Sequence, residues 1–448
     1  MRSIDIRFVF LLFSVLFGAN AFRQPNYRHI WKEYYGKVPS QYNCGAFIAG
    51  DKSKVDAYAQ KGRTPLKKIP QLSMKCEDIR RRILGDGAHN QLDHSYALAR
   101  NVYSPPSQND YYIQEFHLAI SYNPYNVYCY AVDQKSNGTF KQDMRRLEIC
   151  FENIFVLEKE YAFNSAGYFQ DIAHRECTLK MLKRPSDWQY VMFLQNHDIM
   201  LKTPEEISDV IGTLNGTSFT ASEWPNKERI PSGKLTPKAL NFFKDDDSVS
   251  KDVLHRNLVV RKGPNQMMLP RAMMEALENK ANMRNIMDLF NTMEYGIDEM
   301  LYTTLVTAYQ LKLPGQFQNK CHEDKFRYVH WSNSDCKSEG KERHHVCLLG
   351  IEYLPELIFS PYLIEWDFGA MMCISEALYN RTNVDKKHKV DLRPYRSLPQ
   401  VREMKMRAEG KFDACRFRCE TKAGNFLSEA WFAATSSLCD GLRGVLGE

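Results

Sequence analysis

From about residue 112 the chain alternates between segments typical of strands and segments typical of helices. Four short apolar runs predict strands, at residues 115–122, 126–133, 153–158 and 188–194. Amphipathic spacing predicts two helices between these runs, at 141–151 and 169–182. Strands separated by helices indicate a parallel sheet with crossover connections, so the predicted fold class is α/β with a central, mainly parallel sheet.

Another helix is expected to begin at Thr203-Pro204-Glu205-Glu206, where Thr203, the proline and Glu206 have the order of a capping box. Ligands of parallel sheets bind beyond the carboxyl ends of the strands. Two predicted strands end in polar residues, at Val132-Asp133 and at Gln195-Asn196-His197-Asp198. The pattern therefore directs attention to these two strand ends.

The N-terminus carries a targeting signal. Arg2 and Arg7 precede an apolar run that continues weakly to residue 21. About 15 residues cover roughly 22 Å as a helix, against about 30 Å of bilayer hydrocarbon. Ala19-Asn20-Ala21 fits a signal-peptidase site. Residues 1–22 are therefore expected to be a cleaved signal peptide or a short uncleaved signal anchor that contacts the membrane, and both lead into the secretory pathway. A buried N-terminal helix is the remaining alternative.

The rest of the chain divides by composition into three parts. Residues 23–105 contain many prolines and one clear helix signal at 75–84, and are expected to form a stem. Residues 106–382 hold the predicted α/β domain, with further helices expected at 270–281 and 298–311. Residues 383–448 read as a basic tail that contains cysteines.

Composition narrows the function classes. The 448 residues are 44% hydrophobic and 25% charged, which excludes a disordered or coiled-coil protein. Sixty basic and 54 acidic residues give a net charge of +6, too small to indicate nucleic-acid binding. Twelve cysteines without a Cys-x-x-Cys pair suit disulfides rather than metal ligation. Three sequons, at Asn137, Asn215 and Asn380, also favour a lumenal or extracellular glycoprotein.

Six segments carry a family resemblance. They are NVYCYAVD (126–133), ENIFVLEKE (152–160), WQYVMFLQNHDIMLKTPEEI (188–207), IDE (297–299), DCKSEGKERHHVCLLG (335–350) and FGAMMCISEALYNRT (368–382). In this order and spacing they resemble the core-2/I-branching β-1,6-N-acetylglucosaminyltransferases over roughly residues 40–382. The resemblance implies a GT-A-like, Rossmann-type glycosyltransferase domain. It also implies inverting transfer of N-acetylglucosamine from UDP-GlcNAc to a hydroxyl of a glycan or glycoprotein, with no metal or other cofactor.

The resemblance also implies roles for single residues. Glu299 is the expected general base, although two acids in a helix's first turn are also favoured by the helix dipole alone. Val127 and Asp133 are expected to contact the donor, although a strand-end aspartate can simply cap a turn. On the diphosphate side, the family's arginine falls at His344, although a small shift would let Arg343 serve, and the family's lysine falls at or near Asp367. A carboxylate there would repel the diphosphate.

Three disulfides follow from the resemblance: Cys44–Cys373, Cys76–Cys177 and Cys336–Cys347. A fourth family pair would use Cys150, but its partner position holds Gln195, so Cys150 is expected to be free or re-paired. The pairing of the other five cysteines stays open.

Other readings remain open. Asp245-Asp246-Asp247 lies in a polar segment away from any apolar strand end, which favours an exposed acidic loop over a metal site. Transfer of xylose to protein, and a non-catalytic lumenal protein that binds glycans, are the alternatives to the leading activity. The expected location is the Golgi membrane, as a type II protein with a lumenal catalytic domain, and secretion after cleavage is the alternative.

Overall fold

The structure is a computed structural model of the chain. It describes residues 43–60, 72–84, 89–104, 110–184, 186–291, 295–318, 325–331, 336–337, 342–343, 345–358, 364–366, 370–383, 385, 388–413 and 417. The expected targeting segment 1–22 lies outside these residues. Within the described ranges, no helix is both long and apolar enough to cross a membrane.

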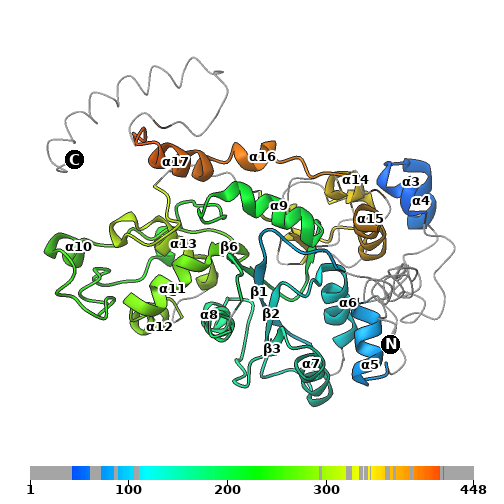
Figure 1. Cartoon of the computed structure of the whole chain (residues 1–448), viewed down its shortest axis with the longest axis horizontal. Coiled ribbons are helices and arrows are strands. Elements are labelled where there is room, and N and C mark those ends of the chain that lie inside the picture. Colours follow the sequence, from blue (N-terminus) through cyan, green and yellow to red (C-terminus); the bar gives the residue numbers. More distant parts are fainter. Residues whose placement is uncertain are drawn as a thin grey trace, which may run out of the picture.

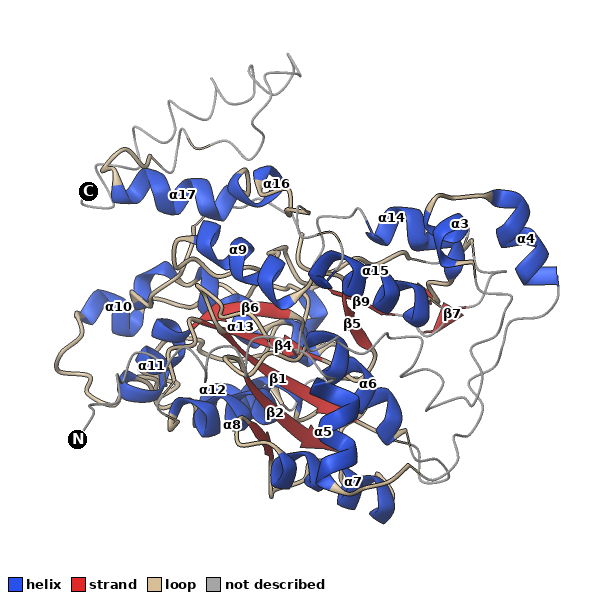
Figure 2. Ribbon diagram, turned by 45° about the vertical axis from the view of Figure 1, so that its right-hand side comes forward, coloured by secondary structure: helices blue, strands red, loops and turns tan. Residues whose placement is uncertain are grey.

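A five-stranded sheet forms the centre of the molecule, in the order β3-β2-β1-β4-β6 (Figure 2). Its strands are β1 (Tyr96–Val102), β2 (Val127–Val132), β3 (Ile154–Val156), β4 (Tyr190–Leu194) and β6 (Met267–Pro270). The first four run parallel, and β6 pairs antiparallel with β4. The predicted α/β fold with a mainly parallel sheet is confirmed.

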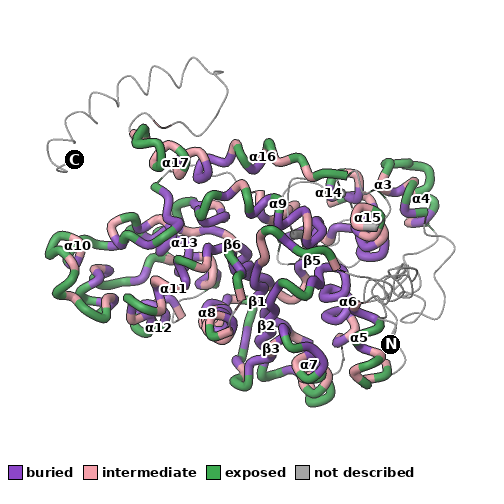
Figure 3. Tube along the Cα trace, in the orientation of Figure 1, coloured by how far each residue is buried: buried purple, intermediate pink, exposed green. Residues whose placement is uncertain are grey.

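Helices cover both faces of this sheet, because alternate strand residues point to opposite sides. One face packs against the helices α5 (Cys76–Leu84), α6 (Tyr111–Ser121), α7 (Gly138–Cys150) and α9 (Pro204–Leu214). The other packs against α8 (Gln170–Leu182), α11 (Arg271–Lys280), α12 (Arg284–Phe290) and α13 (Leu301–Thr307). Figure 3 shows the central strands buried between these layers.

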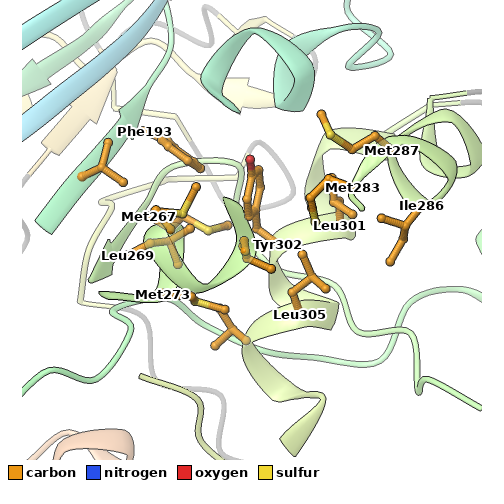
Figure 4. Close-up of a cluster of buried hydrophobic side chains, with 14 of the residues drawn as sticks. Phe193, Met267, Leu269, Met273, Met283, Ile286, Met287, Leu301, Tyr302 and Leu305 are labelled. Atoms are coloured by element: carbon orange, nitrogen blue, oxygen red, sulfur yellow. The ribbon is translucent and has the colours of Figure 1, made fainter. Parts of the chain in front are cut away.

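Methionine and leucine side chains fill much of the second face. Figure 4 shows Tyr302 of α13 among Phe193, Met267 and Leu305, in a close-up of this cluster. Tyr302 is 1% exposed, and its ring meets Phe193 edge-on at 5.0 Å between centroids. This packing fixes the start of α13, which directly follows the short 3₁₀ turn η2 (Ile297–Glu299).

A third cluster joins the start of the described chain to elements between residues 347 and 378. It comprises α3 (Cys44–Ile48), α4 (Lys52–Gln60), the 3₁₀ turn η4 (Ile351–Tyr353), α14 (Leu354–Ile358) and α15 (Met371–Asn383). Two small sheets belong to this region: β5 (Asp198–Met200) with β9 (Ile364–Trp366), and β7 (Glu342–Arg343) with β8 (Val346–Cys347). The remaining elements are η1 (Lys227–Arg229), α10 (Lys251–His255), η3 (Tyr309–Leu311), α16 (Arg393–Arg396) and α17 (Pro399–Ala408).

The expected domain boundaries need correction at both ends. Residues 96–102, expected to belong to a stem, form β1, the middle strand of the main sheet. Tyr395 and Val401, expected in a tail, are buried in the hydrophobic cluster on one face of that sheet. Figure 1 shows α16 and α17 beside α9. The folded domain therefore extends well beyond 106–382 on both sides.

One predicted strand is wrong. Residues 115–122 fall largely within the helix α6, ten of whose eleven residues are buried. A helix buried on every side has no polar stripe, and its apolar run cannot be told from a buried strand by periodicity. By contrast, the capping box is confirmed, since Thr203 Oγ1 accepts from the Glu206 amide and Glu206 accepts from the Thr203 amide.

The disulfides are partly those that the resemblance implies. Cys44–Cys373 and Cys336–Cys347 are present, but the implied Cys76–Cys177 pair is not. Instead Cys76 bonds to Cys150, with 5.1 Å between their Cα atoms, and Cys129 bonds to Cys177. The reason is packing: α5, which begins at Cys76, lies on α7, which ends at Cys150, and α8 places Cys177 over Cys129 of β2.

Candidate active site

A cavity of about 530 Å³ opens at the carboxyl edge of the main sheet. Residues that follow β1, β2 and β4 line it, including Tyr103, Asp133 and the segment 195–198. The chain winds from β1 to β3 in one direction and reaches β4 on the other side of β1. Such a reversal opens a crevice between the loops that leave the two central strands. Both strand ends singled out in the sequence therefore meet in one cavity.

Glu299 stands in the cavity wall at the end of η2. Its Oε2 atom lies 3.1 Å from Arg229 Nη1 and 3.5 Å from Lys262 Nζ. The Glu299 side chain is 28% exposed, so water and ligands reach it. Gly296 passes directly beneath this group with φ +81°: a Cβ atom on it would lie 2.8 Å from Arg229 Nη1 and 2.9 Å from Glu299 Oε2. The two cations and the glycine fix the carboxylate in one orientation.

Asp298 lies beside Glu299 but is buried deeper. Its Oδ2 atom accepts a hydrogen bond of 3.1 Å from Gln195 Nε2. Burial, followed by the nearby negative charge of Glu299, raises the pKa of the Asp298 carboxyl to about 7. Gly167, with φ +97°, makes room for this carboxyl, since a Cβ there would lie 2.6 Å from Asp298 Cγ. Two adjacent acids thus have different environments, and Glu299, in the cavity wall, is the one that pairs with two cations.

A polar network connects Asp298 to a cation. Gln266 Nε2 donates to Gln195 Oε1 at 3.1 Å and to Asp198 Oδ1 at 3.3 Å. Arg327 Nη1 donates to Gln266 Oε1 at 2.6 Å. Asp198 also accepts from the Gln195 amide at 2.6 Å, and burial raises the pKa of its carboxyl. Every one of these side chains lines the cavity.

Asp133 caps a turn and also faces the cavity. Its Oδ1 atom accepts from the Lys135 amide at 2.7 Å, and its Oδ2 lies 3.7 Å from Lys135 Nζ. Burial raises the pKa of the Asp133 carboxyl, although the amide and the ammonium of Lys135 act in the opposite direction. Asp133 can therefore cap the turn after β2 and still offer its carboxyl to a ligand in the cavity.

The other expected donor contacts are placed differently. Val127 is the first residue of β2, 2% exposed, and is not among the residues that line the cavity. Arg343 lies in the β7–β8 hairpin, whose Val346 does line it, so the hairpin reaches the cavity. The side chain of Arg343 lies outside the described part of the chain, and so do His344 and Asp367.

Several lining residues had not been expected from the sequence. Arg327 and Gln266 lie in segments with no motif, and only the folded chain brings them to the strand ends. Tyr295 and Trp331 are 50% and 51% exposed and also line the cavity. Large aromatic side chains exposed at a cavity are an unusual feature that a sequence pattern does not reveal.

No cluster of three or more histidine, cysteine or acidic side chains suited to a metal ion occurs among the described residues. Asp245 and Asp247 are exposed, and Asp246 pairs with Lys238 at 2.8 Å. Of the sequons, Asn215 and Asn380 are exposed. Asn137 is half-buried and caps α7 by accepting from the Phe140 amide. Glycosylation at these sites stays a prediction.

Comparison with known proteins gives a family. The model of the family described as "Branch: Core-2/I-Branching enzyme" matches residues 106–358, more than half of the chain. The "Beta-1,3-galactosyl-O-glycosyl-glycoprotein beta-1,6-N-acetylglucosaminyltransferase 3" of Rattus norvegicus is 28% identical over 191 residues, 43% of each chain. The match with the Ovis aries protein of that name is 24% identical and spans 77% of this chain and 84% of the relative.

The human "N-acetyllactosaminide beta-1,6-N-acetylglucosaminyl-transferase" is 25% identical over 54% of this chain and 61% of its own length. The match with the rat protein covers less than half of that protein's length. Among solved structures, S. aureus TarS in complex with UDP matches 71% of this chain and 83% of that one. Its TM-score of 0.28 and identity of 11% are too low to bear on the fold. On the strength of the family match, the chain belongs to the core-2/I-branching enzyme family.

Proposed function

We propose that this protein is an inverting glycosyltransferase that moves N-acetylglucosamine from UDP-GlcNAc to a glycan hydroxyl in β-1,6 linkage, without a metal. One observation carries the proposal: Glu299 presents a fixed, partly exposed carboxylate to a cavity at the switch point of the parallel sheet. Family membership supports glycosyl transfer, and the names of the relatives suggest the donor sugar and the linkage.

The chemistry requires a base and a stabilised leaving group. Glu299 takes the proton of the acceptor hydroxyl while the hydroxyl oxygen bonds to the anomeric carbon. The bond from that carbon to the diphosphate breaks, and its electron pair leaves with UDP. Attack opposite the leaving group inverts the configuration. Arg229 and Lys262 keep the Glu299 carboxylate pointed at the acceptor side.

The cavity also suits sugar rings. Tyr295 and Trp331 expose about half of their surface at its wall, and aromatic rings of this kind pack against the apolar faces of sugars. Asn101 and Asn265 also line the cavity, and their amide oxygens have no hydrogen-bond partner among the described residues. These features suit a glycan acceptor beside Glu299.

We further propose a Golgi location as a type II membrane protein, with residues 1–22 as the signal anchor. Four disulfides among the described residues support an oxidising lumen. N-terminal sequencing of the mature protein tests the anchor. If the mature protein begins near residue 22, the segment is a cleaved signal peptide and the protein is secreted.

Donor binding tests the activity. The full chain, titrated with UDP-GlcNAc in EDTA by calorimetry, is expected to bind, and to release UDP when O-glycan acceptors are added. Binding that appears only after a divalent cation is restored would contradict the metal-free mechanism. UDP-xylose is the comparison donor, and preference for it would move the proposal to xylosyl transfer. Glycan binding without affinity for either donor would favour the non-catalytic alternative.

A further inference from the structure

The departing UDP carries its charge on the diphosphate, so transfer is favoured by a cation held at that position. Among the described residues that line the cavity, two carry positive charge, Lys135 and Arg327. Lys135 Nζ donates to the backbone oxygen of Phe163 and lies by Asp133, and half of the Lys135 side chain is exposed. Lys135 therefore already serves the turn after β2, and Arg327 is the cation placed inside the cavity wall.

Arg327 is held rigidly at its backbone. The preceding residue, Phe326, is 0% exposed and meets Phe219 edge-on at 5.6 Å between ring centroids. This anchor in the hydrophobic core fixes where the arginine leaves the backbone. A side chain that starts from a fixed point loses less conformational freedom when it binds a ligand.

The guanidinium is also oriented. Its Nη1 atom donates to Gln266 Oε1 at 2.6 Å, and Gln266 is 2% exposed. The amide of Gln266 is in turn fixed by Gln195 and Asp198. Gln195 stands at the position where a disulfide cysteine was expected, and Cys150 pairs with Cys76 instead. At this position Gln195 supplies an amide that, through Gln266, helps to orient a cavity cation.

Two acidic side chains lie near Arg327, and one of them, Asp198, is 2% exposed. The positive charge of Arg327 acts on the carboxyls of Asp198 and Asp298, and yet burial leaves the pKa of both raised. Burial disfavours the charged form of both acids, so they are weaker partners for the guanidinium than unperturbed carboxylates would be. An entering diphosphate is a stronger and better placed partner, since guanidinium and phosphate form paired, charge-assisted hydrogen bonds.

We propose that Arg327 binds the diphosphate of the nucleotide-sugar donor, with Gln266 as its positioning residue. This inference rests on the proposed function. As the bond between the anomeric carbon and the phosphate oxygen breaks, the electron pair passes to that oxygen, and Arg327 stabilises the charge that develops there. The role falls to Arg327 in a chain that has His344 and Asp367 where basic residues were expected.

The test compares UDP with uridine, because the difference between their affinities isolates the diphosphate. Calorimetry on the full chain covers wild type, Arg327→Met and the control Arg175→Met. Arg175 is a cation of α8 that pairs with Glu278 and does not line the cavity. We expect Arg327→Met to weaken UDP binding by about 10- to 100-fold and to leave uridine within twofold. Arg175→Met should change neither affinity.

Two more variants keep the test decisive if Arg327→Met fails to fold. Arg327→Lys keeps the charge but loses the paired geometry, and should weaken UDP binding by about 3- to 10-fold. Gln266→Met keeps Arg327 but removes the amide oxygen that orients its guanidinium, and should weaken UDP binding by a similar factor. Wild-type UDP affinity in the folded Arg327 variants, or wild type that binds UDP no better than uridine, overturns the role of Arg327. Wild type that binds neither ligand overturns the proposed function itself.

Discussion

Adding one methyl group at Gly296 should impair catalysis more than its effect on stability explains. Gly296 has φ +81°, and a Cβ atom there would lie 2.9 Å from Glu299 Oε2 and 2.8 Å from Arg229 Nη1. Ordinary contact begins near 3.4 Å, so in Gly296→Ala the ion pair must move by about half an ångström. A displacement of about 1 Å costs up to about 100-fold in rate, so half of that predicts a loss of about 10-fold in kcat.

A second glycine provides the matched control. Gly216 has φ +79°, nearly the same backbone conformation, but a Cβ atom there meets nothing within 4 Å. Both alanine variants should lose about 1–2 kcal/mol of unfolding free energy, because an L-residue is strained at positive φ. Only Gly296→Ala should lose activity.

The assay is UDP release from UDP-GlcNAc with an O-glycan acceptor, alongside urea unfolding of all three proteins. Equal stability losses with a kcat deficit confined to Gly296→Ala would support the assignment of Glu299. Wild-type kcat in Gly296→Ala, or an equal deficit in Gly216→Ala, would refute the argument that the position of this carboxylate limits the reaction.

Three further predictions concern stability. Replacing Cys129 and Cys177 together by serine should lower the unfolding free energy by about 2–5 kcal/mol, because their bond closes a loop across 48 residues. Urea unfolding measures this loss, and an unchanged unfolding midpoint would argue against that pairing. The pKa of Asp298 in the folded protein is raised to about 7, so folding takes up a proton between about pH 4 and pH 7, and the contribution of this carboxyl to stability is lost as the pH rises through that window. Asp298→Asn should therefore flatten the decline of the unfolding free energy that wild type shows there. Parallel curves of unfolding free energy against pH for the two proteins would contradict this. Tyr302→Phe should not lower the melting temperature, since the buried Tyr302 hydroxyl has no hydrogen-bond partner among the described residues, and a drop of several degrees would reveal a partner.

Short sequence patterns predicted the structure correctly where neighbouring residues alone determine it. The capping box at Thr203 needs only four consecutive residues, and it forms as expected. Likewise β2 and β4 are continuous apolar runs with both faces covered, which is the pattern of buried parallel strands. The position of the cavity followed from the same reasoning, because strand ends of a parallel sheet share one edge.

The central strand β1 escaped prediction because its stability is not local. All seven of its residues are buried, including Arg100 in its interior. The Arg100 guanidinium donates to the backbone oxygens of Gln195 and Asp198, at 3.2 and 2.8 Å. These acceptors lie about a hundred residues away in the sequence, so nothing beside Arg100 indicates that its charge can be buried.

The residues of the site also divide into those that a local motif indicates and those that only the fold brings together. Glu299 could be proposed from a short motif in a recognisable family order, and the structure places it in the cavity wall. Arg327 and Gln266 could not, since their roles depend on contacts with segments far along the chain. The disulfide prediction failed for a related reason: which cysteines meet depends on how α5 packs on α7 and α8 on β2, and no local signal in the sequence shows that packing.

The most direct test of the account is the turnover of Glu299→Gln measured together with its donor affinity. The amide keeps the shape of the side chain but cannot take the acceptor proton, so kcat should fall by about 100-fold or more while UDP-GlcNAc binding stays within a few fold of wild type. Glu278→Gln, on α11 outside the cavity, should behave as wild type. If Glu299→Gln retains wild-type turnover, Glu299 is not the base, and the central claim is contradicted.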